Sequence, residues 1–89
     1  MRAVVSVMGC DKPGIIAKTT TLLAENQVNI LDITQTILQD IFTMVMLVDL
    51  QNCKLEFADL AAQLDALGNE LEVEIRMQHE EIFHSMHRI

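Results

Sequence analysis

Residues 3–26, AVVSVMGCDKPGIIAKTTTLLAEN, join a short apolar run to an amphipathic stretch through a polar turn. The β-branched residues of 3–8 predict a strand, which ends at the glycine, proline and aspartate of the turn. The apolar residues of 15–26 recur at helical spacing and predict a helix with one buried face. Asn26 is placed to close this helix, because asparagine tolerates the left-handed C-terminal conformation.

The rest of the chain continues as strand, strand, helix and strand. Residues 28–37 and 42–50 are rich in β-branched and apolar side chains, and the four residues between them predict a hairpin loop. Residues 55–67 carry apolar side chains three and four positions apart, with Gly68 placed as the C-terminal stop of a helix. Residues 71–78 alternate apolar with polar residues, which predicts a strand with one wet face.

The order βαββαβ predicts an α+β, ferredoxin-like sandwich, a four-stranded antiparallel sheet with two helices on one face. Residues 42–48 are apolar on both sides, so we expect the open face of the sheet to be covered. One candidate cover is residues 79–89, which we predict to be a C-terminal helical extension of a domain spanning residues 1–78. The other is a second subunit. The apolar stripe of the extension consists of Ile82, Phe83, Met86 and Ile89.

Composition excludes several classes of partner. The 89 residues include 6 Lys and Arg against 13 Asp and Glu, which gives a net charge of −7. This charge opposes binding to a phosphate backbone or an anionic membrane surface, and aromatic residues are only 3%, too few to stack nucleobases. The chain is nevertheless 51% apolar, which is more than one small domain can readily bury. This indicates that a partner covers part of the apolar surface.

The location expected from the sequence is the cytoplasm. The central apolar stretch stops at Asp49, short of the roughly 20 residues that a spanning helix needs. The residues that precede Cys10 are too few for a signal peptide of about 15–30 residues. We therefore expect Cys10 and Cys53 to be reduced and chemically inert thiols.

The turn before the first helix has the chemistry of an anion site. Pro13 suits the first helical position and Lys12 the N-cap, but a lysine side chain accepts no hydrogen bond. The first amides, from Gly14 to Ile16, would then be free to bind a carboxylate, and Gly14 would let a ligand approach the backbone closely. The alternative is an ordinary turn that Asp11 caps.

The segment GCDKPGIIA at 9–17, followed by Val-Asn-Ile at 28–30, resembles the ACT domain, the small ligand-sensing module of amino-acid metabolism. The continuation NILDITQT at 29–36 and FTMVMLVD at 42–49 is similar to a bacterial family of stand-alone ACT proteins whose function is not established. The similarity runs from residue 3 to about residue 78.

The resemblance implies a regulatory amino acid bound at an interface, because ACT domains commonly pair side by side or face to face. On this chain the turn side of the site would be Asp11, Lys12, Pro13, Gly14 and Ile15, and the strand side Asn29 and Ile30. Asn29 offers both a donor and an acceptor, although it is also a common turn residue after a helix. We therefore expect a non-enzymatic, cofactor-free homodimer or higher homo-oligomer that binds an amino acid or similar metabolite and acts on another protein.

Other hypotheses remain open at this stage. The chain is alternatively a structural or interaction module that binds no ligand and uses its apolar sheet face. Catalysis of the acylphosphatase kind is disfavoured, because it would need an arginine above a backbone anion site and the only candidate, Arg2, precedes the first strand. Glu80, His84 and His87 share a face of the predicted tail helix at a spacing that suits zinc or nickel, but a solvated face explains them more simply and no metal is expected.

Overall fold

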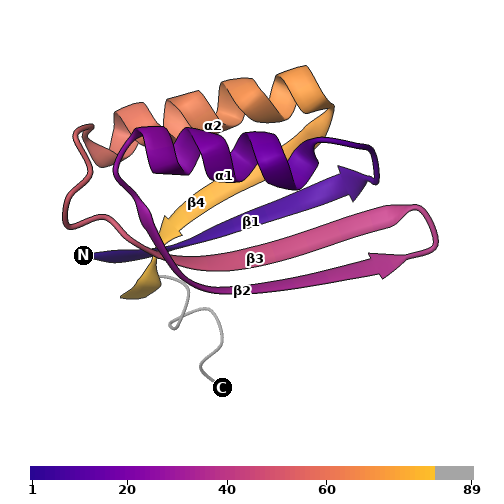
Figure 1. Ribbon diagram of the computed structural model, residues 1–89, viewed down its shortest axis with the longest axis horizontal. Coiled ribbons are helices and arrows are strands. Elements are labelled where there is room, and N and C mark those ends of the chain that lie inside the picture. The colour runs from indigo at the N-terminus through magenta and orange to yellow at the C-terminus, as the bar shows by residue number, and fades with distance from the viewer. Residues whose placement is uncertain (82–89) are drawn as a thin grey trace.

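The computed structural model describes residues 1–81 of the chain. The strands form one antiparallel sheet in the order β2-β3-β1-β4, and both helices cover the same face of it (Figure 1). This arrangement confirms the predicted ferredoxin-like fold. The elements are β1 Arg2–Cys10, α1 Ile15–Glu25, β2 Asn29–Leu38, β3 Ile41–Asp49, α2 Phe57–Leu71 and β4 Val73–His79.

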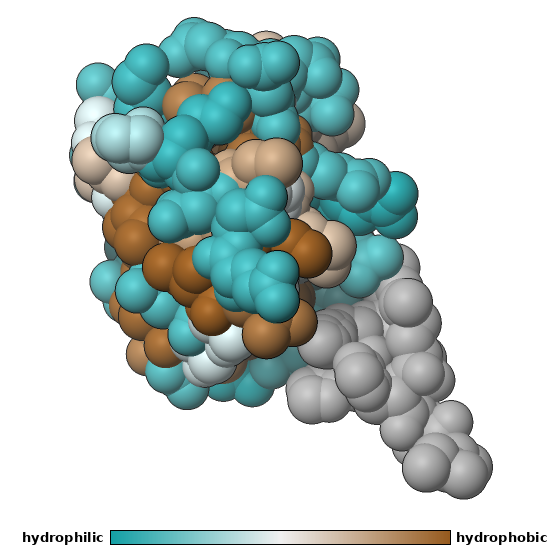
Figure 2. All heavy atoms as spheres, turned by 90° about the vertical axis from the view of Figure 1, so that its right-hand side faces the viewer, coloured by the Kyte–Doolittle hydropathy of each residue, from teal (hydrophilic) through white to brown (hydrophobic). Residues whose placement is uncertain are grey.

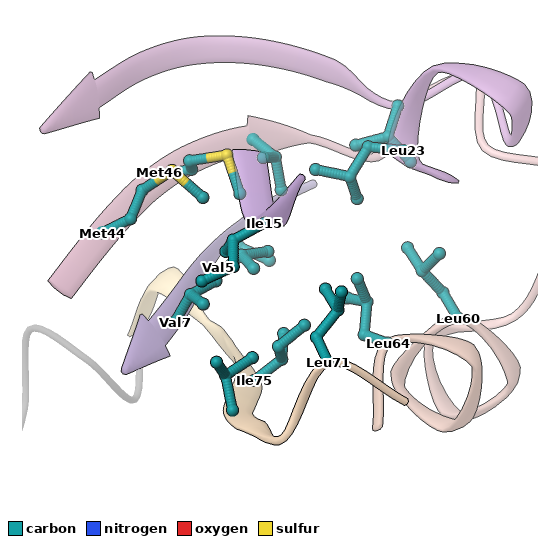
Figure 3. Packing of buried hydrophobic residues seen from close by; sticks show 14 of the residues in the cluster. Val5, Val7, Ile15, Leu23, Met44, Met46, Leu60, Leu64, Leu71 and Ile75 are labelled. Carbon is teal, nitrogen blue, oxygen red and sulfur yellow. The ribbon is translucent and has the colours of Figure 1, made fainter. Parts of the chain in front are cut away.

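The hydrophobic core lies between the sheet and the helices. Strand β1 is central and pairs along most of its length with both β3 and β4, so that Val7 lies beside Met44 on one side and Ile75 on the other. Side chains at alternate strand positions point toward the helices and are buried, as the period of a strand requires. Figure 3 shows side chains from three strands and both helices meeting in this layer. The fully buried ones include Val5, Val7, Ile15, Leu23, Met44, Met46, Leu60 and Leu64.

Helix α2 does not end where the sequence indicated. It passes through Gly68, which is buried, and ends at Leu71, where Glu72 takes the left-handed conformation with φ 58°. Gly68 is needed for packing instead of termination, because a Cβ there would lie 2.8 Å from the backbone oxygen of Val73. The prediction of Gly68 as the stop is therefore wrong, and strand β4 begins at Val73 instead of residue 71.

The other boundaries differ for local reasons. Asn26 has φ −99°, and the left-handed residue after α1 is Gln27 with φ 63°, so the expected role of Asn26 is wrong. The Asn26 side chain instead donates to the backbone oxygen of Leu22 at 2.9 Å and to Gln63 Oε1 at 3.1 Å, which links the two helices. The β2–β3 loop is shorter than predicted, because Leu38 and Ile41 already pair.

The open face of the sheet mixes apolar and polar side chains. The row that crosses it contains Thr34, Val45, Ser6 and Arg76, in the order of the strands. Val45 is exposed, and Glu74 forms an ion pair with Arg76 at 2.6 Å. The predicted apolar stripe of the tail, which begins at Ile82, lies outside the described residues, so its proposed position over this face stays a prediction.

We predict that Gly68→Ala destabilises the protein by more than about 1 kcal/mol, although alanine is the better helix former by about that amount. The added Cβ would meet the backbone of β4, which cannot move without disturbing the sheet. Urea unfolding followed by circular dichroism measures the change. Asn69→Ala, at an exposed position in the same helix, is the control and should be neutral or slightly stabilising. An equal gain from both substitutions would contradict the packing role of Gly68.

Candidate functional site

Helix α1 starts at Ile15, directly after a glycine in an unusual conformation. Gly14 is the N-cap residue, with φ 92° and ψ −6°, and no side chain within residues 1–81 caps the helix. The sequence had placed Lys12 at the N-cap and Pro13 at the first helical position, and both assignments are wrong. The left-handed conformation of Gly14 turns the chain after Pro13, so the helix begins two residues later.

The first amides of α1 are open. The N–H of Lys18 donates to the carbonyl oxygen of Gly14 at 2.9 Å, the first bond of the helix. Within residues 1–81, the N–H groups of residues 15–17 have no protein acceptor. The Asp11 carboxylate does not cap them, so the alternative of an Asp11-capped turn is wrong. The Asp11 N–H donates instead to the carbonyl oxygen of Asp40 at 2.8 Å, which attaches the turn to the β2–β3 hairpin.

A pocket of about 380 Å³ opens beside these amides. Its volume is near the lower limit of roughly 300–1,000 Å³ for small-molecule sites. Phe42 and Ile15, which are 2% and 1% exposed, give it an apolar floor, and Asp11 and Lys12 supply charge. The lining residues are Asp11, Lys12, Gly14, Ile15, Ile16, Ala17 and Phe42, so four of the five predicted turn residues meet here. Pro13 is exposed and is not part of the lining.

The predicted strand side of the site lies elsewhere in the same chain. Asn29, at the start of β2, pairs with Asp49, which also pairs with Arg2 at the start of β1. The turn follows Cys10, at the opposite end of β1. Because β2 has 10 residues at about 3.4 Å each, its two ends are roughly 30 Å apart. Figure 1 shows the start of β2 and the β1–α1 turn at opposite ends of the molecule. One copy of the chain therefore does not bring Asn29 and Ile30 to the turn.

Strand β2 exposes apolar side chains on both of its faces. It is an edge strand, and every residue from Leu31 to Leu38 is exposed. Ile33 and Ile37, which are 43% and 52% exposed, pair with Met46 and Phe42 and so point to the helix side, beyond the cover of the helices. Figure 2 looks at the end of the molecule that carries the hairpin and shows hydrophobic residues gathered in a band below a mostly hydrophilic upper part.

Sequence reasoning missed two contributors to the pocket region. Phe42 lies beside the turn because it pairs with Gly9, the second-last residue of β1. The position of Phe42 next to the hairpin loop would have indicated this pairing once the order of the strands was known. Glu72 approaches from α2, with its Oε1 3.3 Å from Lys12 Nζ. No signal in the sequence placed Glu72 there, because the sequence ended the helix at the wrong residue.

The other candidate residues form no disulfide and no metal-binding group within residues 1–81. Cys10 is exposed and Cys53 is half-buried, and both are free. Within residues 1–81, no three His, Cys, Asp or Glu side chains are grouped as metal ligands. Glu80 pairs with Arg2, while His84 and His87 lie outside the described residues. None of the helices in residues 1–81 has the length and apolar character that crossing a membrane requires.

Comparison with known proteins identifies close relatives. The family model of the ACT domain matches residues 2–78. A UPF0237 protein of Methanococcus maripaludis is 52% identical over 86 residues, which cover 97% of this chain and 96% of the relative. An ACT domain protein from Streptococcus pneumoniae is 40% identical, with a TM-score of 0.82 and 93% of each chain covered. A formyltetrahydrofolate deformylase from Pseudomonas syringae shares the fold alone, at 20% identity and a TM-score of 0.77, over 88% of this chain and 27% of its own.

We predict that Gly14→Ala lowers the free energy of unfolding by about 1–2 kcal/mol, because an L-residue with a Cβ is strained in the left-handed region. A Cβ at this position would meet no atom of residues 1–81 within 4 Å, so the loss comes from the strained backbone. Gly14→Asn should lose less, since asparagine visits this region more readily. Urea unfolding of the three proteins measures the order, and equal stability of all three would disprove the strain.

Proposed function

The chain belongs to the ACT domain family, and on that premise we propose that it is a non-enzymatic sensor of a small amino acid or similar metabolite. ACT domains are typically regulatory modules that respond to small ligands. The observation that carries the proposal is the pocket beside the open amides at the start of α1. We expect a cytoplasmic protein that needs no cofactor and passes the signal to another protein by contact.

The groups around the pocket suit a zwitterion. Open amides at the positive end of a helix, together with the Lys12 ammonium, favour a carboxylate. The Asp11 carboxylate in the same lining repels a simple anion but favours an ammonium group. The apolar floor formed by Phe42 and Ile15 fits a small aliphatic side chain. An aliphatic α-amino acid carries a carboxylate, an ammonium group and an apolar side chain, whereas phosphate or acetate offers only the negative charge.

We propose that two copies complete the site by pairing their β2 strands. Two-fold symmetry with the axis perpendicular to the sheet makes this pairing antiparallel. The start of β2 in one copy then lies beside the end of β2 in the other, next to the hairpin that holds the turn. Asn29 and Ile30 of one copy would thereby approach the pocket of its partner, which no arrangement within one chain achieves.

The two edges of the sheet differ in how well they resist such pairing. Strand β4 carries Glu74 and Arg76 as an exposed ion pair, and charged side chains are a common protection of an edge. Strand β2 has one charged residue, Asp32, and no lysine, arginine or proline, and its exposed isoleucines Ile33 and Ile37 would lie on one side of the joined sheet. We therefore assign the dimer contact to β2.

A ligand bound between copies stabilises the paired state. A ligand at a hundredfold excess over its Kd stabilises the form that binds it by about 2.7 kcal/mol. If only the dimer has the complete site, this free energy shifts the equilibrium from monomer to dimer. A downstream protein that contacts the dimer alone would then respond to the concentration of the ligand.

We predict that at least one common amino acid raises the melting temperature of the protein and that Lys12→Met and Asn29→Ala each abolish the rise. A heterodimer with Lys12→Met in one copy and Asn29→Ala in the other should bind that amino acid at about half of the wild-type stoichiometry, since it keeps one intact site of two. Two affinity tags isolate the heterodimer, and calorimetry counts its sites.

The outcomes separate the hypotheses. If no amino acid changes the melting temperature, the chain is better described as an interaction module without a ligand. If the ligand binds and Asn29→Ala leaves the rise in melting temperature unchanged, the pocket takes all its residues from one copy and the shared site is wrong.

We predict that Ile33→Lys weakens the dimer by at least about tenfold, because symmetry brings two new charges to one seam. Gln78→Lys, on β4, adds the same charge at the other edge and is the control, for which we expect an unchanged dimer. Sedimentation velocity over a concentration series measures both. Loss of the dimer only in the control would assign the contact to β4.

A further inference from the structure

We infer that Glu72 competes with the ligand for Lys12 and so sets the affinity of the pocket for a carboxylate. This inference rests on the proposed function. Among residues 1–81, Lys12 is the only cation that lines the pocket, and its acidic partner there is Glu72, with Oε1 3.3 Å from Nζ. A ligand carboxylate at the open amides of α1 would approach the same ammonium group.

The fold keeps Glu72 beside the turn. Strands β1 and β4 pair so that Gly9 lies opposite Val73, and a Cβ at Gly9 would be 2.7 Å from the Val73 side chain. Glu72 directly precedes Val73 and is the single residue between α2 and β4. Its left-handed backbone, with φ 58°, is held at both ends by these two elements. The position of the Glu72 backbone near the turn is therefore a consequence of the sheet register, and from there its side chain reaches Lys12.

The ion pair is weak enough to exchange. The Glu72 side chain is 82% exposed and the Lys12 side chain 32%, and exposed pairs of this kind contribute little to stability. A ligand carboxylate gains the same ammonium together with the open amides of residues 15–17, which Glu72 does not reach in the structure. Binding would therefore move Lys12 from Glu72 to the ligand, and the cost of breaking the pair is subtracted from the affinity.

A neighbouring ion pair provides a matched control. Lys18 of α1 pairs with Glu70 of α2 at 3.0 Å, and both side chains are exposed. Lys18 does not line the pocket. Glu70→Gln therefore removes the same charge from the same region as Glu72→Gln, but it frees a lysine that has no part in the proposed site.

The test uses glycine and acetate as probes, with sodium chloride at equal ionic strength as the blank. Backbone amide shifts of residues 14–17 are followed by NMR in the wild type and the variants. Glu72→Gln should lower the Kd of both probes by about two- to fivefold, the range expected for loss of an exposed ion pair. Glu70→Gln should leave the Kd unchanged. In the Lys12→Met background, where binding should be lost, Glu72→Gln should not restore it, as expected if the effect passes through Lys12.

The results distinguish this inference from the function on which it rests. If neither probe gives saturable shifts in the wild type or in any variant, the proposed site itself is wrong. If the probes bind and Glu72→Gln leaves the Kd unchanged or raises it, the site stands and the competition is wrong. An equal gain from Glu70→Gln, or binding that Glu72→Gln restores in the Lys12→Met background, would attribute the effect to the net charge of the protein and would also overturn the inference.

Discussion

The pairing of β1 with a strand on each side is the constraint on which the rest of the structure depends. Val5 and Val7 are fully buried in this central strand, so a shift of register by one residue would turn them to the open face. The same register places Gly9 between Phe42 and Val73. The turn that follows β1 is therefore held beside the hairpin on one side and beside the α2–β4 junction on the other.

The candidate site takes its chemistry mainly from the backbone. The open amides exist because Gly14 turns the chain and no side chain of the described part of the chain caps α1. Charged side chains set the electrostatics of this site. Asp11 and Lys12 line the pocket, and Glu72 forms an ion pair with Lys12. Such a site is compatible with much variation in sequence, because most of its donors are amides that every residue except proline has.

The comparison of sequence with structure is most informative at the helix ends. The apolar spacing of the sequence identified both helices but misplaced the end of α2. Glycine is common where helices end, whereas Gly68 lies inside the helix and packs against the backbone of β4. The sequence also misplaced the start of α1. Proline is common in the first turn of a helix, but the left-handed Gly14 makes this helix begin after it, at Ile15. The first error therefore arises from the packing of Gly68 against β4, and the second from the left-handed Gly14 next to Pro13.

The sequence by itself determined the order of elements and the buried face of each one, because these follow from periodicity and residue type. Only the tertiary structure decided that Phe42 and Glu72 reach the turn and that Asn29 is roughly 30 Å away from it, at about 3.4 Å per strand residue. The reason is that strand order and register are set by packing between distant segments, which local pattern does not encode.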